Sequence, residues 1–485
     1  MARVVILGGG VSGHTAASYL SSWLGKEHQV VVVTPNSKWN WIPSNIWVGV
    51  GRKSKDDVVF ELDPVYKKAG IDYRQALAKT IHPEGDDESG PYVTIQYTGQ
   101  GKEGESDKVP YDFLINATGP KLNFDATEGL GPHGGYSLSV CTADHAVETN
   151  EKLQELIEQM KRGEKKTLVV GSGHGLCTCQ GAAFEYLFNV EHELKVAGVR
   201  DKAELIWLSN ESFLADFGMG GMHVKQGGFL TSSKVFAESL YAEKGIKWIL
   251  GAHVTKVEEG LVHFETLDGT FHEQKFDFAM LLPPFSGVGL TAFNAKGEEI
   301  TDKLFAPNGL MKVDADYTKK PYEEWKASDW PSTLQNPDYG NIFAVGIAFA
   351  PPHTISKPMQ SANGTPITPT PPRTGMPSAM MGKAVAQTIR DMIVDGAKEP
   401  THTACMSEMG AACVASVGTG LFRGSAVSMT VFPIVPDFEK YPGIGRDMNL
   451  TTGEIGLAGH WIKVILHYVF IWKAKMKAFW KLIPE

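Results

Sequence analysis

Short runs of β-branched and aliphatic residues recur along the chain, each followed by a glycine turn or by a segment with helical spacing. Such runs are typical of parallel strands that are covered on both faces. One strand–turn–helix–strand series begins at residue 3, and a second begins at residue 167. The pattern predicts an α/β protein with two Rossmann-like domains in tandem. The expected strands are 3–7, 30–33, 111–117, 167–170, 204–208 and 341–348.

The first glycine turn lies between a strand and a small-residue helix and contains Gly8, Gly10 and Gly13. In the dinucleotide fingerprint, these three glycines make the tight turn, let the backbone approach a pyrophosphate, and allow close helix packing. The helix that contains Ser12 would supply amide donors to the phosphates. The turn therefore predicts a dinucleotide cofactor.

Two later segments favour FAD as that cofactor. The strands before Thr118-Gly119 and before Gly346 both end at glycine turns, and they resemble the strands that return to the FAD in two-dinucleotide flavoproteins. An acidic residue normally ends the second strand and binds the ribose. This chain has Thr34-Pro35-Asn36 there, so we expect a weaker contact from a hydroxyl or an amide.

The second glycine turn is degenerate. Leu176 occupies the place of the third glycine, and the next strand ends in Ser209-Asn210 without a carboxylate. A leucine at this place would block close helix packing on a pyrophosphate. We therefore expect a domain that kept the nucleotide-binding fold and lost its nucleotide, which argues against an NADH dehydrogenase.

Five cysteines are too few for a disulfide scaffold, so their placement matters more than their number. Cys177 and Cys179 follow the second glycine turn at a helix N-terminus, where a thiol pKa is lowered. Cys405 comes after the flavin-returning strand, and Cys141 lies at the crossing between domains. Cys413 has no distinguishing context and is expected to be structural. No zinc-type spacing of cysteines and histidines is present, so we expect no metal.

Two titratable residues lie near these cysteines in the sequence. Glu185 follows Cys179 by about one and a half helical turns, and His145 follows Cys141 by four residues. Each is a candidate proton carrier. The alternatives are a plain carboxylate on a helix face and a structural histidine.

Composition and charge narrow the function classes. The chain has 485 residues, of which 42% are hydrophobic and 21% charged, with a net charge of -9. These values fit a globular protein and argue against a nucleic-acid partner, because phosphate binding needs a concentrated basic face. No apolar run is long enough for a spanning helix. The N-terminus opens directly on a strand, so we expect no cleavable leader.

Residues 460–483 combine lysines and aromatic residues, with no acidic residue before Glu485. This composition predicts an amphipathic helix that lies in the headgroup region of a bilayer, with its lysines at the headgroups. The protein would then be peripheral or monotopic. The alternative is a helix packed on the protein's own core or on a partner subunit.

Jointly, these motifs resemble the sulfide:quinone oxidoreductases, relatives of the type II NADH dehydrogenases and the flavocytochrome c sulfide dehydrogenases. The resemblance runs from residue 1 to the C-terminal helix. Besides the cysteine turn with Phe184-Glu185-Tyr186, it covers residues 43–51, 111–125, 283–285 and 346–348.

The resemblance implies a glutathione-reductase-type flavoprotein whose redox pair is Cys179 and Cys405. Sulfide would attack a sulfur bridge between them, with Cys179 carrying sulfur and Cys405 attacking the flavin. The reduced flavin would pass its electrons to a membrane quinone. Cys141 matches a position that is linked covalently to the flavin in some relatives and serves sulfur transfer in others. Arg373 stands where relatives place a lysine near the flavin pyrimidine.

The implied cofactor contacts are Gly8, Gly10, Ser12, Gly13, Thr34, Ala78, Thr118, Gly119, Gly346, Arg373, Thr374 and Gly375. Phe422, Phe432 and Phe438 are candidates for a quinone slot, with core packing as their alternative. The loop 351–372 is either a surface excursion or a lid over the flavin. The resemblance also implies a small homo-oligomer on a prokaryotic-type membrane.

The expected organisation has four parts. These are the first part of an FAD-binding domain (1–140), a second Rossmann-like domain with the degenerate site (141–299), the second part of the FAD-binding domain (300–400), and a C-terminal redox-cysteine and membrane-anchoring region (401–485). The alternative functions are a flavocytochrome c-type sulfide dehydrogenase and a type II NADH:quinone dehydrogenase.

Overall fold

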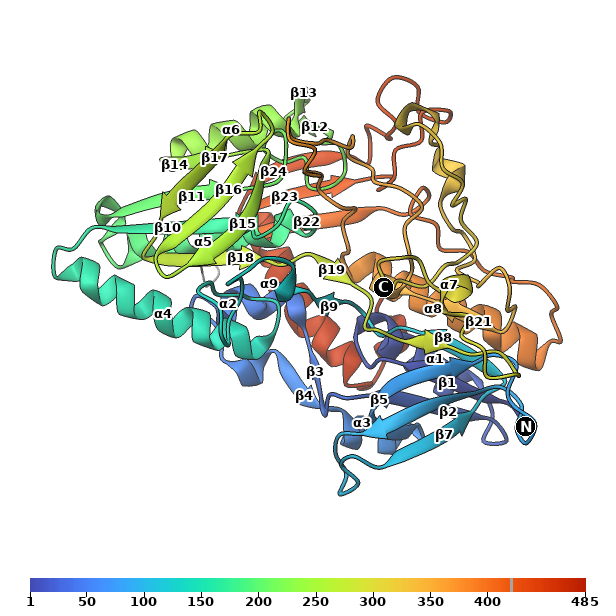
Figure 1. The fold of residues 1–485 in the computed structure, drawn as a ribbon. Helices are drawn as coiled ribbons and strands as arrows, with labels where there is room; N and C mark the ends of the chain where they lie inside the picture. The colour runs from blue at the N-terminus through green and yellow to red at the C-terminus, as the bar shows by residue number, and fades with distance from the viewer. Residues whose placement is uncertain (419–421) are drawn as a thin grey trace.

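A computed structural model describes residues 1–418 and 422–485 (Figure 1). The first domain is built on an eight-stranded sheet, in which the apolar runs near the N-terminus form parallel central strands. In spatial order its strands are β21 (Ile342–Ala344), β8 (Phe113–Asn116), β1 (Arg3–Leu7), β2 (Gln29–Thr34), β5 (Asp72–His82), β6 (Tyr92–Tyr97) and β7 (Ser106–Pro110), with β20 (Thr291–Ala292) paired to β5.

Two helices pack closely beside this sheet. Helix α1 (Val11–Trp23) begins at the first glycine turn, and helix α8 (Gly375–Val394) comes from a distant part of the chain. A Cβ on Gly382 would lie 2.3 Å from the carbonyl oxygen of Ser12. Only glycine allows this approach, so Gly382 brings the two helices together near the start of α1.

The second glycine turn starts another parallel sheet. Its order is β14 (Ile246–Ile249), β11 (Ala203–Leu208), β10 (Lys166–Ser172) and β18 (Phe278–Leu282). Helices α4 (Ala143–Lys161), α5 (Gln180–Val196) and α6 (Ser233–Glu243) accompany it, with a three-stranded sheet of β15 (Ala252–Glu258), β16 (Leu261–Thr266) and β17 (Phe271–Lys275). The predicted tandem α/β repeat is thus present.

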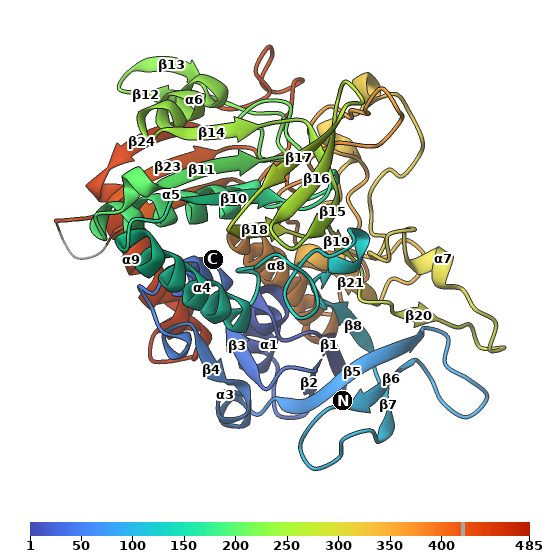
Figure 2. The same ribbon diagram turned by 60° about the vertical axis from the view of Figure 1, so that its left-hand side comes forward.

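The C-terminal segment completes a further sheet with strands of the second repeat. Its order is β13 (Phe229–Ser232), β12 (His223–Gln226), β24 (Thr452–Gly456), β23 (Ser425–Val431) and β22 (Ala411–Val417). Helix α9 (Leu457–Ala474) follows β24 and packs against β22 and β23 (Figures 1 and 2). Its end reaches α1, where the Ala474 carbonyl is 2.7 Å from His14 Nε2.

Smaller elements connect these layers. They are β3 (Lys38–Asn40), β4 (Val59–Glu61), β9 (Lys121–Leu122), β19 (Phe285–Ser286), α2 (Asn45–Val48), α3 (Leu62–Ala69), α7 (Thr301–Leu304) and short 3-10 helices at 42–44, 55–57, 124–126, 200–202, 322–324, 327–329, 346–348 and 480–482. None of the helices in the described part of the chain has both the length and the hydrophobicity needed to cross a bilayer.

Candidate active site

The first glycine turn has the geometry of a phosphate-binding loop. A Cβ on Gly8 would lie 2.1 Å from the Ala117 carbonyl oxygen, and one on Gly13 would lie 2.1 Å from the Gly8 carbonyl oxygen. A Cβ on Gly10 would meet no atom within 4 Å. The turn is therefore closed on the protein side and open at Gly10, and no side chain caps the first turn of α1. This cradle fits the pyrophosphate of a dinucleotide.

Several other predicted cofactor residues lie near the same loop, and Ala78 lies on β5. Gly346 has φ +66°, and a Cβ there would lie 2.5 Å from Ser12 Oγ. Thr34 is buried at the end of β2. Gly119 has φ +70°, which favours glycine, and the Thr118 hydroxyl beside it donates to Asn116 Oδ1. Ala78 lies at a bulge in the pairing of β5 with β6.

Arg373 connects this half of the site to the cysteines. Its guanidinium lies 4.9 Å from the centroid of the Phe349 ring and donates to the Phe349 carbonyl. Burial lowers the pKa of Arg373 to about 10, while Cys179 and Tyr317 favour its charged form. Thr374 is the N-cap of α8 and makes no capping bond with its side chain, and Gly375 begins the helix. A cation and free helix-terminal amides therefore stand next to Cys179.

The two cysteines of the second turn differ in environment. Cys177 is fully buried, and its thiol donates to the Leu282 carbonyl at 2.9 Å. Cys179 is half-buried, caps α5 with φ +64°, and has its sulfur 4.0 Å from the Arg373 carbonyl oxygen. The expected lowering of the thiol pKa at this helix N-terminus is wrong: burial raises the pKa of both thiols, and the Arg373 cation opposes this rise at Cys179. Of the pair, Cys179 is the accessible sulfur.

The other predicted cysteines lie on separate elements. Cys405 is buried, with its sulfur 2.9 Å from Ser407 Oγ and 3.9 Å from the Trp330 carbonyl oxygen. Cys141 is half-buried just before α4, and burial raises its pKa to about 12, with the Cys179 thiol adding to the rise. The redox pairing of Cys179 with Cys405 stays a prediction.

The two candidate proton carriers have different surroundings. The carboxylate of Glu185 is buried and ion-paired with Lys463 at 2.9 Å. The ring of His145 contacts those of Phe124 and His133, and its buried Nδ1 has no hydrogen-bond partner. Burial lowers the pKa of His145, so the neutral form is favoured.

Cys413, which the sequence predicts to be structural, packs against helix α5. Its sulfur lies 3.3 Å from where a Cβ on Gly181 would stand, in the first turn of the helix that Cys179 caps. Burial raises the pKa of Cys413 to about 11, and Glu185 and Cys179 act in the same direction. No motif marks this residue, because its place depends on how β22 packs against α5.

The loop 351–372 crosses the degenerate second turn. Its Thr368 and Thr370 amides donate to the carbonyls of Gly175 and Cys177, at 2.8 and 3.0 Å. Thr178 in turn donates to the Pro371 carbonyl at 2.9 Å. The chain itself thus covers the turn where a second dinucleotide would bind. The loop therefore obstructs nucleotide binding at this turn, in addition to the effect of replacing the third glycine with Leu176.

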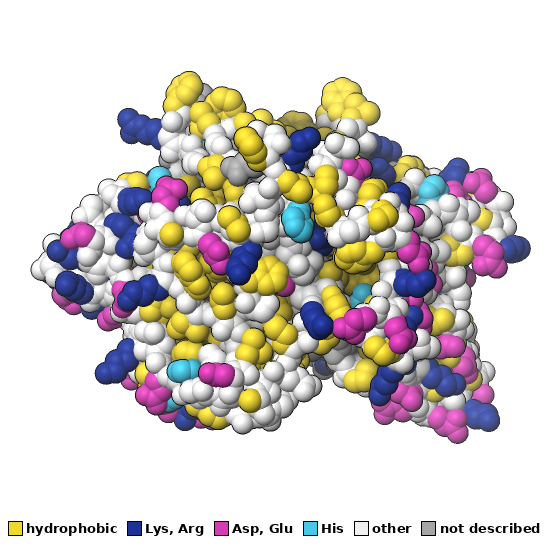
Figure 3. Space-filling model, turned by 90° about the horizontal axis from the view of Figure 1, so that it is seen from above, with side chains coloured by type: hydrophobic (Ala, Val, Ile, Leu, Met, Phe, Trp, Pro, Cys, Tyr) yellow, Lys and Arg dark blue, Asp and Glu magenta, His cyan; other side chains and the backbone are white. Residues whose placement is uncertain are grey.

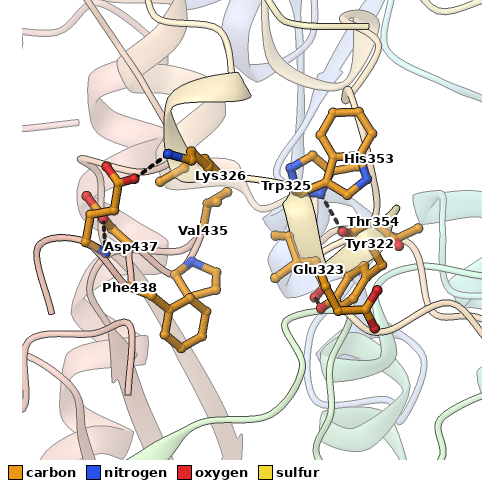
Figure 4. A pocket seen from close by; sticks show the side chains of 13 residues that line it. Tyr322, Glu323, Trp325, Lys326, His353, Thr354, Val435, Asp437 and Phe438 are labelled. Atoms are coloured by element: carbon orange, nitrogen blue, oxygen red, sulfur yellow. Dashed lines mark hydrogen bonds and ion pairs between the residues drawn. The ribbon is translucent and has the colours of Figure 1, made fainter. Parts of the chain in front are cut away.

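The three phenylalanines proposed for a quinone slot lie in different settings. Phe422, after β22, is 82% exposed, and Phe432 is half-buried. Phe438 lines a cavity of about 190 Å³ (Figure 4). The cavity lies between three segments, which also contribute Tyr322 and Trp325, His353, and Val435. The assignment of these residues to quinone binding stays a prediction.

Helix α9 is amphipathic, but its polar side chains face the protein interior and its large apolar side chains face outward. Its inward polar side chains are His460, Lys463, His467 and Lys473, and its exposed large side chains are Trp461, Ile462, Ile465, Tyr468 and Trp472. The prediction that the lysines of this segment lie at headgroups is therefore wrong for Lys463 and Lys473. Lys463 is paired with Glu185, and Lys473 with Glu485 at 2.6 Å. The apolar side faces outward because the polar side finds partners inside.

One face of the molecule has mixed charges. Figure 3 shows acidic and basic side chains interspersed on the face seen from above, with hydrophobic side chains gathered between them. Within residues 1–418 and 422–485, no three cysteine, histidine or acidic side chains are grouped to hold a metal ion.

Comparisons with known proteins agree with this geometry. Residues 2–186 match the family model described as pyridine nucleotide-disulphide oxidoreductase. The sulfide-quinone reductase of Aquifex aeolicus is 30% identical over 475 residues, which cover 98% of this chain and 91% of the relative. Its X-ray structure, titled as a sulfide:quinone oxidoreductase, superposes with a TM-score of 0.75 at 28% identity, over 98% and 92% of the two chains. The NDH2 structure from Plasmodium falciparum shares the fold alone, with a TM-score of 0.63 at 14% identity over 98% and 96%.

The fold and the first glycine turn are those of the pyridine nucleotide-disulphide oxidoreductases, whose family model matches residues 2–186. Within that class, the match over nearly the whole length of both chains decides the family. The chain belongs to the sulfide:quinone oxidoreductases.

Proposed function

We propose that this protein oxidises sulfide to polysulfide or sulfur at Cys179 and Cys405, and delivers the electrons through FAD to a membrane quinone. The observation that carries the proposal is the position of Cys179. Cys179 is the N-cap residue of α5, and its sulfur lies 4.0 Å from the carbonyl oxygen of Arg373, just before the start of α8. A nucleophilic sulfur is thereby held next to the part of the first domain that is shaped for a dinucleotide.

The residues of the first domain fit FAD. The cradle of Gly8, Gly10 and Gly13 would hold the pyrophosphate, and Thr34 would approach the ribose. The α8 amides and Arg373 would stabilise negative charge on the flavin. When bound, FAD supplies the two-electron acceptor that links sulfide oxidation to quinone reduction.

Cys179 and Cys405 have different roles in the proposed sulfur chemistry. Thiol–disulfide exchange requires an accessible attacking sulfur and a leaving thiolate. Cys179 is the accessible sulfur, and the family resemblance assigns the partner role to Cys405. In the proposed step, sulfide attacks a bridge between them, leaving a persulfide on Cys179 and a thiolate on Cys405.

Cys141 is assigned either to sulfur transfer or to a thioether with FAD. Unfolding the purified protein separates these roles. Flavin that stays with the unfolded chain indicates the thioether, and flavin that is released indicates sulfur transfer.

The outward apolar side of α9 supports peripheral binding to a bilayer. Exposed aromatic and aliphatic side chains along one helix face are typical of a helix that lies in the interface. Because a membrane quinone is dissolved in the lipid, binding of α9 to the bilayer surface would bring the protein close to its electron acceptor. Light scattering in detergent would test the proposed small homo-oligomer.

A direct test of the proposal uses the paired cysteine variants. We expect Cys179→Ser and Cys405→Ser each to retain FAD and to lose flavin reduction by sulfide. Flavin reduction at the wild-type rate in either variant would overturn the assigned pairing.

A further inference from the structure

One face of α5 joins the cysteine turn to the C-terminal helix. Gly181 and Glu185 are four residues apart and therefore lie on the same face of this helix. Cys413 packs beside Gly181, and Glu185 Oε1 accepts a hydrogen bond from the Ser416 amide at 3.2 Å. Strand β22 thus covers this face, with Cys413 beside Gly181 and Ser416 beside Glu185.

Lys463 reaches the same carboxylate from α9. Its ammonium lies 2.9 Å from Glu185 Oε2 and donates to the Val414 carbonyl at 3.2 Å. The side chains of Lys463 and Glu185 are only 13% and 6% exposed. A buried ion pair therefore connects the outward-facing helix to the helix that Cys179 caps.

The charged and titratable groups around Glu185 are few. Lys463 belongs to α9, as does His460, which bonds to Ser416, and Cys413 belongs to β22. Cys179 caps the same helix as Glu185. Helix α2 also packs on α5, and it brings Trp47 with no charged side chain.

The charge of Glu185 depends on its partner. Burial raises the pKa of this carboxyl, and the Lys463 ammonium opposes that rise. A buried carboxylate without a counter-charge takes up a proton instead of remaining ionised. Without Lys463, Glu185 would therefore be neutral over a wider range of pH and unable to accept a proton.

We propose that Lys463 is a positioning residue for sulfide oxidation, holding Glu185 ionised as the proton acceptor of the cysteine site. This inference rests on the proposed function. When HS⁻ attacks the sulfur bridge, a sulfur–sulfur bond forms on Cys179 and the bridge bond breaks, releasing the second cysteine as a thiolate. The proton of the persulfide is then taken up by the Glu185 carboxylate.

The experiment is anaerobic stopped-flow reduction of the flavin by sulfide as a function of pH. We expect Lys463→Met to move the acidic limb of the rate profile upward by about one pH unit, which is about a tenfold loss of rate on that limb. Lys463→Arg retains the charge and should restore the wild-type profile. Lys68→Met removes an exposed lysine in the last turn of α3, outside every site described, and serves as the matched control.

Glu185→Gln keeps the test decisive if Lys463→Met folds poorly. The neutral amide should abolish the acidic limb, and adding Lys463→Met to it should cause no further shift. A wild-type profile in Glu185→Gln, or an unmoved limb in folded Lys463→Met, overturns the inference. Failure of sulfide to reduce the wild-type flavin is a different outcome, because it removes the proposed function itself.

Discussion

The Cys177 thiol donates a hydrogen bond to the Leu282 carbonyl, whereas the Cys179 sulfur, two residues later, lies half-buried beside Arg373. The left-handed backbone at Cys179 turns the second sulfur away from the core that holds the first. The two cysteines of this turn therefore differ in their access to a reactant.

This difference predicts unequal effects of substitution. Cys179→Ser should lower the rate of flavin reduction by sulfide by at least about 10³-fold, as loss of a covalent nucleophile does. Cys177→Ser keeps a donor for Leu282 and should react at close to the wild-type rate. Stopped-flow absorbance on both variants at equal FAD content makes the comparison. Equal losses in the two would contradict the assignment.

The glycine cradle predicts separable effects on folding and on FAD binding. Gly13→Ala places a Cβ against the Gly8 carbonyl oxygen, so we expect it to destabilise the protein by about 2 kcal/mol or more. Gly10→Ala meets no atom of the chain, so the apoprotein should change by less than about 0.5 kcal/mol. The new methyl group should nevertheless weaken FAD binding. Denaturation of the apoprotein and flavin titration measure the two quantities, and unimpaired FAD binding by Gly10→Ala would rule out this cradle.

The outward side of α9 predicts binding to lipid vesicles. Ile465 is 58% exposed in the middle of that side. Replacing it with aspartate should lower vesicle binding by roughly tenfold or more, since burial of an isoleucine contributes about 1.5–3 kcal/mol. Val394→Asp, at an exposed position on α8, is the control. Flotation with anionic vesicles compares them, and equal binding by both variants would exclude α9 as the anchor.

Two buried histidines predict that acid loosens α9. His14 bonds to the Ala474 carbonyl and His467 to Ser44, and burial lowers the pKa of each from 6.5 to about 4. The unfolded chain takes up protons first as the pH falls, so the contribution of these histidines is complete above pH 6.5 and is lost on descent toward pH 4. For His14 the loss is up to about 3 kcal/mol. Hydrogen exchange of the α9 amides should accelerate across this window, and His14→Gln should flatten the dependence.

The tandem fold and the first cofactor loop could be predicted because their signals are local. Gly8, Gly10 and Gly13 stand at fixed spacing after an apolar strand, and that spacing alone requires a tight turn next to a helix. The buried ion pair of Lys463 with Glu185 could not be predicted, because its members are 278 residues apart. From the sequence alone, a lysine in an apolar helix is expected to contact lipid headgroups, because its buried partner cannot be identified.

The same limit applies to Cys413 and to the loop 351–372. The loop carries few regular signals, and its hydrogen bonds to Gly175 and Cys177 are made by backbone groups that every residue has. The position of Cys413 beside Gly181 is evident only from the packing of β22 on α5. These contacts are set by tertiary structure, which local pattern does not encode.

The most direct measurement is anaerobic addition of sulfide to the yellow holoprotein, followed by a short-chain quinone, with the flavin absorption band recorded throughout. The account predicts that sulfide bleaches the band, that NADH does not, and that quinone restores the colour. Bleaching by NADH in place of sulfide would contradict it, since the second turn would then bind a nucleotide despite Leu176 and the covering loop.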